Sequence, residues 1–275
     1  MRFLKLTSIF AILIGCALGQ PQVSSNGVLN GGSFVVGQAV APGSVVSIFG
    51  SGLAAATLVG DTIPLSASLG ATTVYFNGEQ APLYFVSAGQ INAQLPWDLL
   101  SNGATSGTVN VTVTNGAQTS SPMTVQLAAI APGIYSIPSG AGYAVAINNS
   151  DQSIAAPIGA IPGILTHPAS AGDVMIMYAN GLGPVGVPNS SGGLTLSPPA
   201  LGAASLDATR YTLTSPTLLI GGTQAQLLFS GLAPQFVGIS QVNFVVPTVT
   251  PGNSIPIQLV AGGITSTDQV VIAIQ

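Results

Sequence analysis

The stretch Gln90-Ile91-Asn92-Ala93-Gln94-Leu95-Pro96 returns later in the chain as Gln241-Val242-Asn243-Phe244-Val245-Val246-Pro247. The sequence upstream of each copy also repeats, because residues 43–53 (GSVVSIFGSGL) resemble residues 172–182 (GDVMIMYANGL). A repeat on the order of a hundred residues is too long for a solenoid unit. It predicts two related domains in tandem.

Within each copy, short apolar runs rich in Val, Ile and Thr are bounded by turn residues. Residues 108–114 alternate apolar and polar side chains, which is typical of a half-buried strand. Asn77-Gly78 follows another apolar run and is a strong hairpin signal. We therefore predict an all-β fold of two tandem Ig-like β-sandwiches. Their expected bounds are 41–128 and 129–275, with loop insertions at 183–215 and 230–240 in the second.

The chain has few charges: 4% of its 275 residues are charged and 47% are hydrophobic. Its basic residues are Arg2, Lys5 and Arg210, and the first two precede residue 20. Without residues 1–19, one cation would remain against seven acids, a net charge of −6. Such a chain cannot neutralise phosphates over a surface, so we expect no nucleic-acid binding.

Residues 1–19 have the features of a secretory signal peptide. Arg2 and Lys5 precede an apolar stretch over 6–14, and Ala17-Leu18-Gly19 predicts cleavage after Gly19. The alternative is a lipobox at residues 13–16, in which Cys16 is acylated and the protein becomes an outer-membrane lipoprotein. Residues 20–40 would then serve as a polar lead-in or tether. We favour cleavage after Gly19 and a secreted or cell-envelope location, with no transmembrane helix.

Several motifs, in order, carry a resemblance to known families: residues 41–53, 89–97 (GQINAQLPW), 131–135 (APGIY), 180–185 (NGLGPV) and 238–247. They resemble the uncharacterised Solibacter-type C-terminal domain of acidobacterial secreted proteins, over about residues 28–275. That resemblance implies export and no assigned activity. Each half is also similar, more weakly, to IPT/TIG immunoglobulin-like repeats, which implies small β-sandwiches.

The repeated amides are candidate ligand-binding residues. Gln90 and Asn92 are two residues apart and share one face of a strand, as do Gln241 and Asn243. They could hydrogen-bond a sugar or peptide, or they could satisfy loop backbone inside the fold. Their presence in both copies favours the structural interpretation. Trp97, with Tyr75, Phe76 and Tyr84, could stack on a carbohydrate, although core and inter-domain packing is favoured for most of them.

Catalytic and metal-binding patterns are weak. His167 is the single histidine, no Gly-x-Ser-x-Gly motif is present, and no motif contains two carboxylates. Asp151 with Asn148 and Asn149 could hold Ca²⁺ loosely, but an Asx-rich turn is favoured. We therefore expect no enzyme activity, cofactor or metal. A hydrolase that uses His167 is kept only as a third hypothesis against which the other two are compared.

The expected function is a secreted or cell-surface interaction module. It would bind an extracellular protein or glycan through loops 53–71, 183–215 and 230–240, because long loops on a rigid sandwich commonly carry binding. The alternative is a structural or spacer pair of Ig-like domains without a specific ligand.

Overall fold

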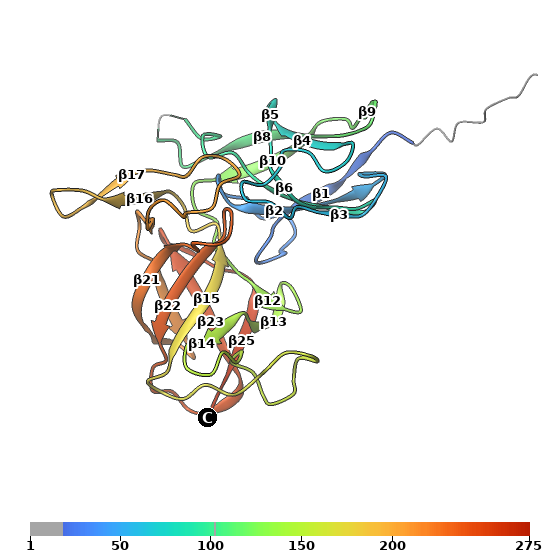
Figure 1. The fold of residues 1–275 in the computed structure, drawn as a ribbon. Helices are drawn as coiled ribbons and strands as arrows, with labels where there is room; N and C mark the ends of the chain where they lie inside the picture. Colours follow the sequence, from blue (N-terminus) through green and yellow to red (C-terminus); the bar gives the residue numbers. More distant parts are fainter. Residues whose placement is uncertain (1–18, 102) are drawn as a thin grey trace, which may run out of the picture.

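The computed structural model describes residues 19–101 and 103–275 (Figure 1). These residues contain strands, turns and loops, and no helix. Four sheets form two β-sandwiches, so the all-β prediction is confirmed. In Figure 1 the strands of the first sandwich run across the page, and those of the second run mostly up and down it.

The first sandwich packs two five-stranded sheets face to face. Sheet A has the order β1 (Gln22–Asn30), β2 (Val45–Ser51), β7 (Gln90–Gln94), β6 (Leu83–Val86), β3 (Leu58–Val59). Sheet B has the order β10 (Met123–Ala128), β8 (Ser106–Asn115), β4 (Thr72–Phe76), β5 (Glu79–Gln80), with β9 (Gln118–Thr119) beside β8. Buried Ile48 and Ile91 from sheet A meet Phe76 and Val111 from sheet B in one core.

The second sandwich packs an eight-stranded sheet on a seven-stranded one. Sheet C has the order β11 (Gly133–Ile134), β15 (Val174–Asn180), β22 (Ser240–Val245), β21 (Gln226–Leu232), β18 (Tyr211–Thr212), β16 (Val185–Pro188), β17 (Leu194–Leu196), with β14 (Ala146–Asn148) beside β15. Sheet D has the order β12 (Ser136–Ile137), β13 (Ala141–Ala144), β25 (Gln269–Ile274), β23 (Gly252–Ala261), β19 (Thr217–Ile220), β20 (Thr223–Gln224), with β24 (Ile264–Thr265) beside β23. Met175, Phe244 and Ile272 are among the buried residues that join the two sheets.

The local patterns explain these strands. Val109, Val111 and Val113 of β8 are buried, and the polar residues between them are not, as the alternation predicts. Asn77 and Gly78 both have positive φ, 50° and 88°, which is the conformation of a type I′ hairpin turn between β4 and β5.

The sequence repeat is also a structural repeat. The register of β6 on β7 shifts between Leu83 and Phe85, and that of β21 on β22 shifts between Leu227 and Phe229. Both bulges therefore lie at the same point of the repeated motif. Gly52 and Gly181, the last residue but one in each copy of the upstream motif, have φ of +63° and +70°.

Two boundary expectations are corrected. Residues 20–40 are not simply a lead-in or tether, because Gln22–Asn30 form β1 and bury Val23, Val28 and Leu29 against the rest of sheet A. The insertion 183–215 is not a plain loop either. Strands β16 and β17 pair into a hairpin that projects from the molecule, and β18 attaches it to sheet C (Figure 1).

The structure also bears on membrane crossing. Residues 19–101 and 103–275 contain no helix that is long and apolar enough to cross a bilayer.

Candidate functional site

The repeated amides lie on the outer faces of sheets A and C. In β22, Val242 and Phe244 point into the core, so Gln241 and Asn243, which alternate with them, face outward. Gln241 Nε2 donates to Asn243 Oδ1 at 2.9 Å. The first copy repeats this contact, with Gln90 Nε2 donating to Asn92 Oδ1 at 2.9 Å. All four side chains are half-buried, so they are neither core groups nor fully free.

Aromatic side chains flank each amide pair across the strands. In the first copy Phe49 lies opposite Gln90 and Phe85 opposite Asn92. In the second copy Tyr178 lies opposite Gln241 and Phe229 opposite Asn243. Each sandwich thus carries the same outer-face group, two amides between two aromatic rings.

In sheet C this group is extended by further aromatic residues. Phe236 packs on Tyr178 with ring centroids 5.4 Å apart, and Tyr211 packs on Phe229 at the same separation. Gly231, between Gln241 and Tyr211 in the ladder, leaves room for the Phe229 ring, because a Cβ there would lie 2.7 Å from Phe229 Cζ. We call Tyr178, Gln241, Asn243, Phe229, Tyr211 and Phe236 the aromatic–amide face.

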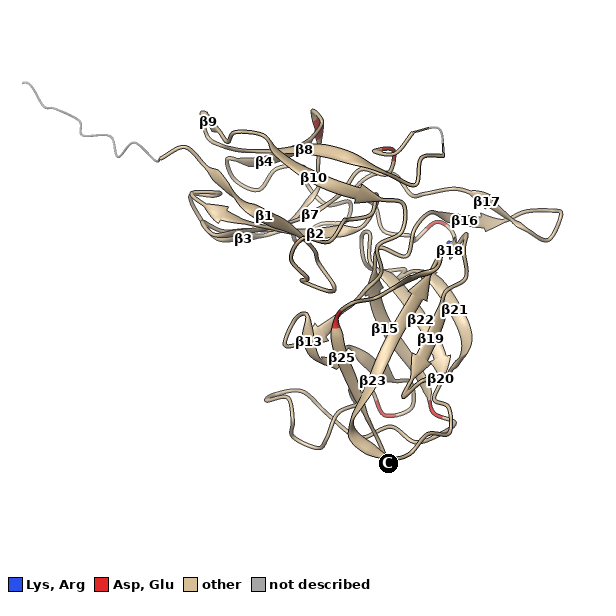
Figure 2. Cartoon of the chain, turned by 180° about the vertical axis from the view of Figure 1, so that it is seen from behind, with Lys and Arg blue, Asp and Glu red and all other residues tan. Residues whose placement is uncertain are grey.

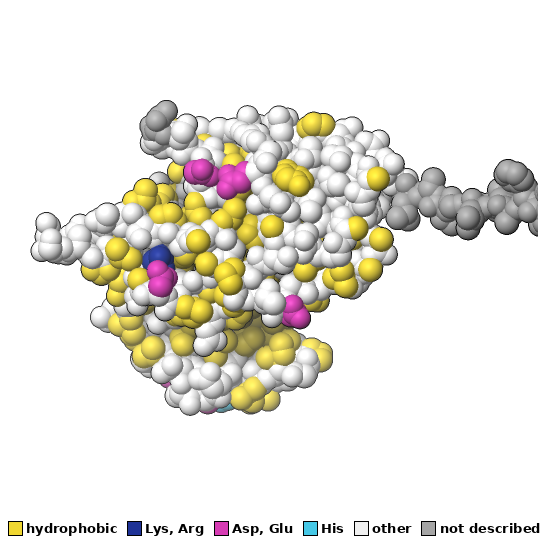
Figure 3. All heavy atoms as spheres, turned by 45° about the horizontal axis from the view of Figure 1, so that its top comes forward, with side chains coloured by type: hydrophobic (Ala, Val, Ile, Leu, Met, Phe, Trp, Pro, Cys, Tyr) yellow, Lys and Arg dark blue, Asp and Glu magenta, His cyan; other side chains and the backbone are white. Residues whose placement is uncertain are grey.

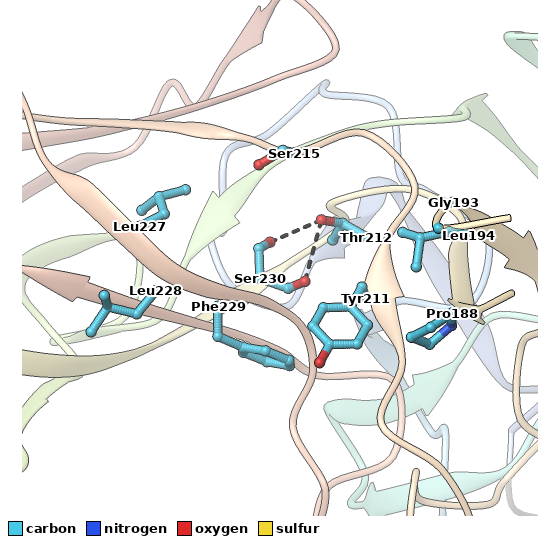
Figure 4. Close-up of a pocket in the computed structure, with 11 residues that line it drawn as sticks. Pro188, Gly193, Leu194, Tyr211, Thr212, Ser215, Leu227, Leu228, Phe229 and Ser230 are labelled. Carbon is cyan, nitrogen blue, oxygen red and sulfur yellow. Dashed lines mark hydrogen bonds between the residues drawn. The ribbon is translucent and has the colours of Figure 1, made fainter. Parts of the chain in front are cut away.

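A cleft of about 380 Å³ adjoins this face (Figure 4). Figure 4 shows Tyr211 and Phe229 side by side, with Pro188 and Leu194 of the β16–β17 hairpin across from Phe229 and Leu228. The Thr212 and Ser230 hydroxyls hydrogen-bond at 3.0 Å. No lining residue is charged, and Leu228 is 52% exposed. The cleft therefore offers apolar and aromatic contacts with a few uncharged polar groups.

The corresponding face of sheet A is turned toward the second sandwich. Phe34 packs on Phe49 at 6.2 Å between ring centroids. The Tyr84 hydroxyl, from β6, donates to the Val237 carbonyl at 2.8 Å and accepts from the Val237 N–H at 2.6 Å. The two copies of the motif therefore have different surroundings, and the copy in sheet C carries the cleft.

Buried amides that we did not single out from the sequence join the two sandwiches. Asn180 Oδ1 accepts from the Val45 N–H at 3.1 Å, and Asn180 Nδ2 donates to the Val45 carbonyl at 2.7 Å and to Asn30 Oδ1 at 2.9 Å. Gln94 Nε2 donates to the Gly43 carbonyl, and its Oε1 accepts from the Gly202 N–H at 2.8 Å. Asn180 and Gln94 have no exposed surface.

The three loops that we expected to bind a ligand contact one another at this junction. Leu65, Ala204 and Val237, one from each loop, form a buried cluster with Tyr84. The Leu65 N–H also donates to the Gly202 carbonyl at 2.8 Å. Much of these loops therefore serves to hold the sandwiches together.

The remaining aromatic candidates do not form one platform. Phe76 is buried in the core, and Tyr75 is half-buried on sheet B. Trp97 is half-buried against Gly43, where a Cβ would lie 2.0 Å from the indole Cε3. Its indole N–H is buried and makes no hydrogen bond to the residues described.

Hydrogen bonds from Ser153, and to a lesser extent the charge of His167, lower the pKa of Asp151, which places His167 near that carboxylate. The Ser153 hydroxyl donates to Asp151 Oδ1 at 2.7 Å, so a serine and a carboxylate meet without the imidazole between them. Asn148 Oδ1 accepts from the Ser150 N–H at 2.9 Å, which is the Asx turn we favoured over a Ca²⁺ site. Cys16 lies outside the described residues, and Gly19, at the expected cleavage point, is exposed.

Charged groups are sparse over the whole cartoon (Figure 2). Arg210, the one Lys or Arg within residues 19–101 and 103–275, bonds both carboxylate oxygens of Asp207, at 2.6 and 3.0 Å. That contact lowers the pKa of Asp207 to about 2. Asp268 is buried and accepts from the Ile134 N–H, and burial raises its pKa.

Residues 33–127 match the IPT/TIG domain. No curated protein matches the chain. Solved structures similar over 93% of this chain include the plexin A4 full extracellular region (11% identity, TM-score 0.26), the titin I9–I11 tandem (11%, 0.22) and the BSP domain of a biofilm associated protein (12%, 0.25). The chain spans 18%, 66% and 29% of those chains.

Proposed function

We propose that the protein is a secreted, non-catalytic binding module and that the aromatic–amide face of sheet C, with its cleft, is the binding surface. The observation that carries this proposal is the pairing of aromatic rings that are half-buried, or in Phe236 exposed, with uncharged hydrogen-bonding groups on the outer face of one sheet. Aromatic rings supply contact area, and amides fix the orientation of a bound polar group. The absence of charge from the cleft lining favours a neutral ligand, a glycan before a protein segment.

Secretion is part of the proposal and rests on the leader described above. The IPT/TIG match over residues 33–127 supports an Ig-like module. We propose further that the whole chain beyond the leader belongs with the Solibacter-type domain, because the shared motifs extend through residue 247. Under this proposal the leader is removed after Gly19, and acylation of Cys16 is the alternative.

The proposal can be tested by screening the protein against immobilised neutral glycans and against native cell-envelope fractions. Tyr211→Ala and Phe229→Ala should each weaken a saturable interaction at least tenfold, because a central aromatic contact commonly contributes this much. The matched control is Tyr75→Ala, which removes a half-buried aromatic from the outer face of the other sandwich. Equal loss in all three variants would refute the assignment of the face.

A rigid spacer is the second candidate function. The buried amides at the junction favour it, because they fix the angle between the sandwiches without forming an open site. A well-folded protein that is retained by none of the glycans or envelope fractions would favour the spacer.

A further inference from the structure

A second cleft, of about 440 Å³, lies where the two sandwiches meet. The first sandwich contributes Trp97, Asp98 and Leu100 to its lining, and the second contributes Pro184, Leu196 and Pro198. Clefts of this size at domain interfaces are common sites for small ligands. It lies apart from the aromatic–amide face and shares no lining residue with the first cleft.

The walls of this cleft are mainly apolar. Leu196, on the projecting β17 strand, is 61% exposed, although a leucine at a packed junction would be expected to be covered. The Trp97 indole packs directly against Gly43, because a Cβ at Gly43 would lie 2.0 Å from its Cε3. Figure 3 shows apolar side chains gathered around the hollow between the two parts of the molecule.

Asp98 brings a negative charge to this apolar cleft. Burial and the neighbouring Asp98 carboxylate raise the pKa of Glu79, so the two acidic groups lie close enough to repel one another. Arg210 is the one cationic side chain of the described residues, and it is bonded to Asp207. Asp98 lines the cleft, and neither Asp98 nor its neighbour Glu79 has a cationic partner within the part of the chain described.

We propose that this cleft binds a small organic cation with an apolar body. The apolar part would lie against Trp97 and Leu196, and the ammonium group would lie beside Asp98, with Glu79 adding to the negative potential. An indole face also attracts cations, so the wall and the carboxylate favour the same ligand class. Charge complementarity selects this ligand over a neutral molecule of the same shape.

The test uses the full chain, because the cleft needs both sandwiches. Trp97 is the single tryptophan, so its fluorescence reports on the cleft directly. The probes are 4-phenylbutylamine, protonated at neutral pH, and 4-phenylbutan-1-ol, which has nearly the same shape without the charge. The amine should bind about tenfold more tightly at low salt, and added salt should reduce that difference.

Two variants separate charge from shape. Asp98→Asn should lower the amine affinity about tenfold and leave the alcohol unchanged. Leu196→Ser should weaken both probes. Asp61→Asn is the matched control, an exposed acid in a loop that does not line this cleft, and should change neither.

Three results would overturn the proposal: equal affinity for amine and alcohol, unchanged selectivity in Asp98→Asn, or no response of Trp97 to the amine at any soluble concentration. Glycan binding by the aromatic–amide face can succeed or fail independently of all three.

Discussion

Replacing Asn180 with Ala should loosen the junction between the sandwiches. The change removes the acceptor of the buried Val45 N–H, and an unsatisfied buried N–H costs about 1–3 kcal/mol. It also removes donors to the Val45 carbonyl and to Asn30 Oδ1, worth about 1 kcal/mol each at most. The Val45 carbonyl still accepts from the Gly31 N–H, and Asn30 Oδ1 still accepts from the Gly32 N–H. Losing the two hydrogen bonds donated by Asn180 therefore costs less than leaving those acceptors unsatisfied. The expected decrease in unfolding free energy is about 3 kcal/mol.

Urea denaturation followed by Trp97 fluorescence and by circular dichroism measures this decrease. Asn149→Ala, an exposed asparagine of the same sandwich, should change stability by no more than about 0.5 kcal/mol. A double-mutant cycle between Asn30 and Asn180 should give a coupling energy of about 1 kcal/mol. A decrease below about 1 kcal/mol for Asn180→Ala, or no coupling, would show that the buried amides do not hold the junction.

Three further predictions concern buried polar groups. Gln94→Val should lower stability by about 2 kcal/mol in thermal or urea unfolding, because the Gly202 N–H loses its acceptor. Tyr84→Phe should cost about 1–2 kcal/mol at neutral pH, since it removes both hydrogen bonds to Val237. Burial raises the pKa of Tyr84 to about 12, opposed by the Val237 hydrogen bond, so stability should fall between about pH 10 and 12, and less steeply in Tyr84→Phe. The raised pKa of Asp268 means that its stabilising contribution is full below about pH 4 and is lost as pH rises through the folded pKa. From pH 3 to pH 7, the free energy of unfolding of the native chain should therefore fall relative to that of Asp268→Asn. A difference between the two proteins that stays constant over this range would contradict the prediction.

Much of the fold could be predicted because its signals are local or repeated. Alternation identified β8, and Asn77-Gly78 located the hairpin after β4. Strand β1 was missed because it does not keep a period of two. Its pairing with β2 shifts register between Val23 and Val28, and Asn26 has a φ of +53°.

The candidate face was predicted only in part. The amide pairs could be found from the repeat, but their aromatic neighbours come from other strands, and their alignment depends on register and on the bulges of β6 and β21. Sequence reasoning does not determine such long-range pairing.

The junction residues did leave a signal, in the positions where the two copies differ. Gln94 corresponds to Val245 in the repeat, and Asn180 corresponds to Ser51. A side-chain amide that has no counterpart amide in the other copy is not required by the shared fold. Gln94 and Asn180 both proved to be buried hydrogen-bonding groups between the sandwiches.

The hydrogen bonds of Gln94 and Tyr84 impose an order on the folding of the chain during its synthesis. A growing chain that has reached residue 128 contains every strand of the first sandwich, yet Gly202 and Val237 do not exist. Until they are made, Gln94 Oε1 and the Tyr84 hydroxyl form hydrogen bonds with water instead. The nascent first sandwich therefore has a hydrated surface at these positions, and the last third of the chain covers that surface once it has been synthesised.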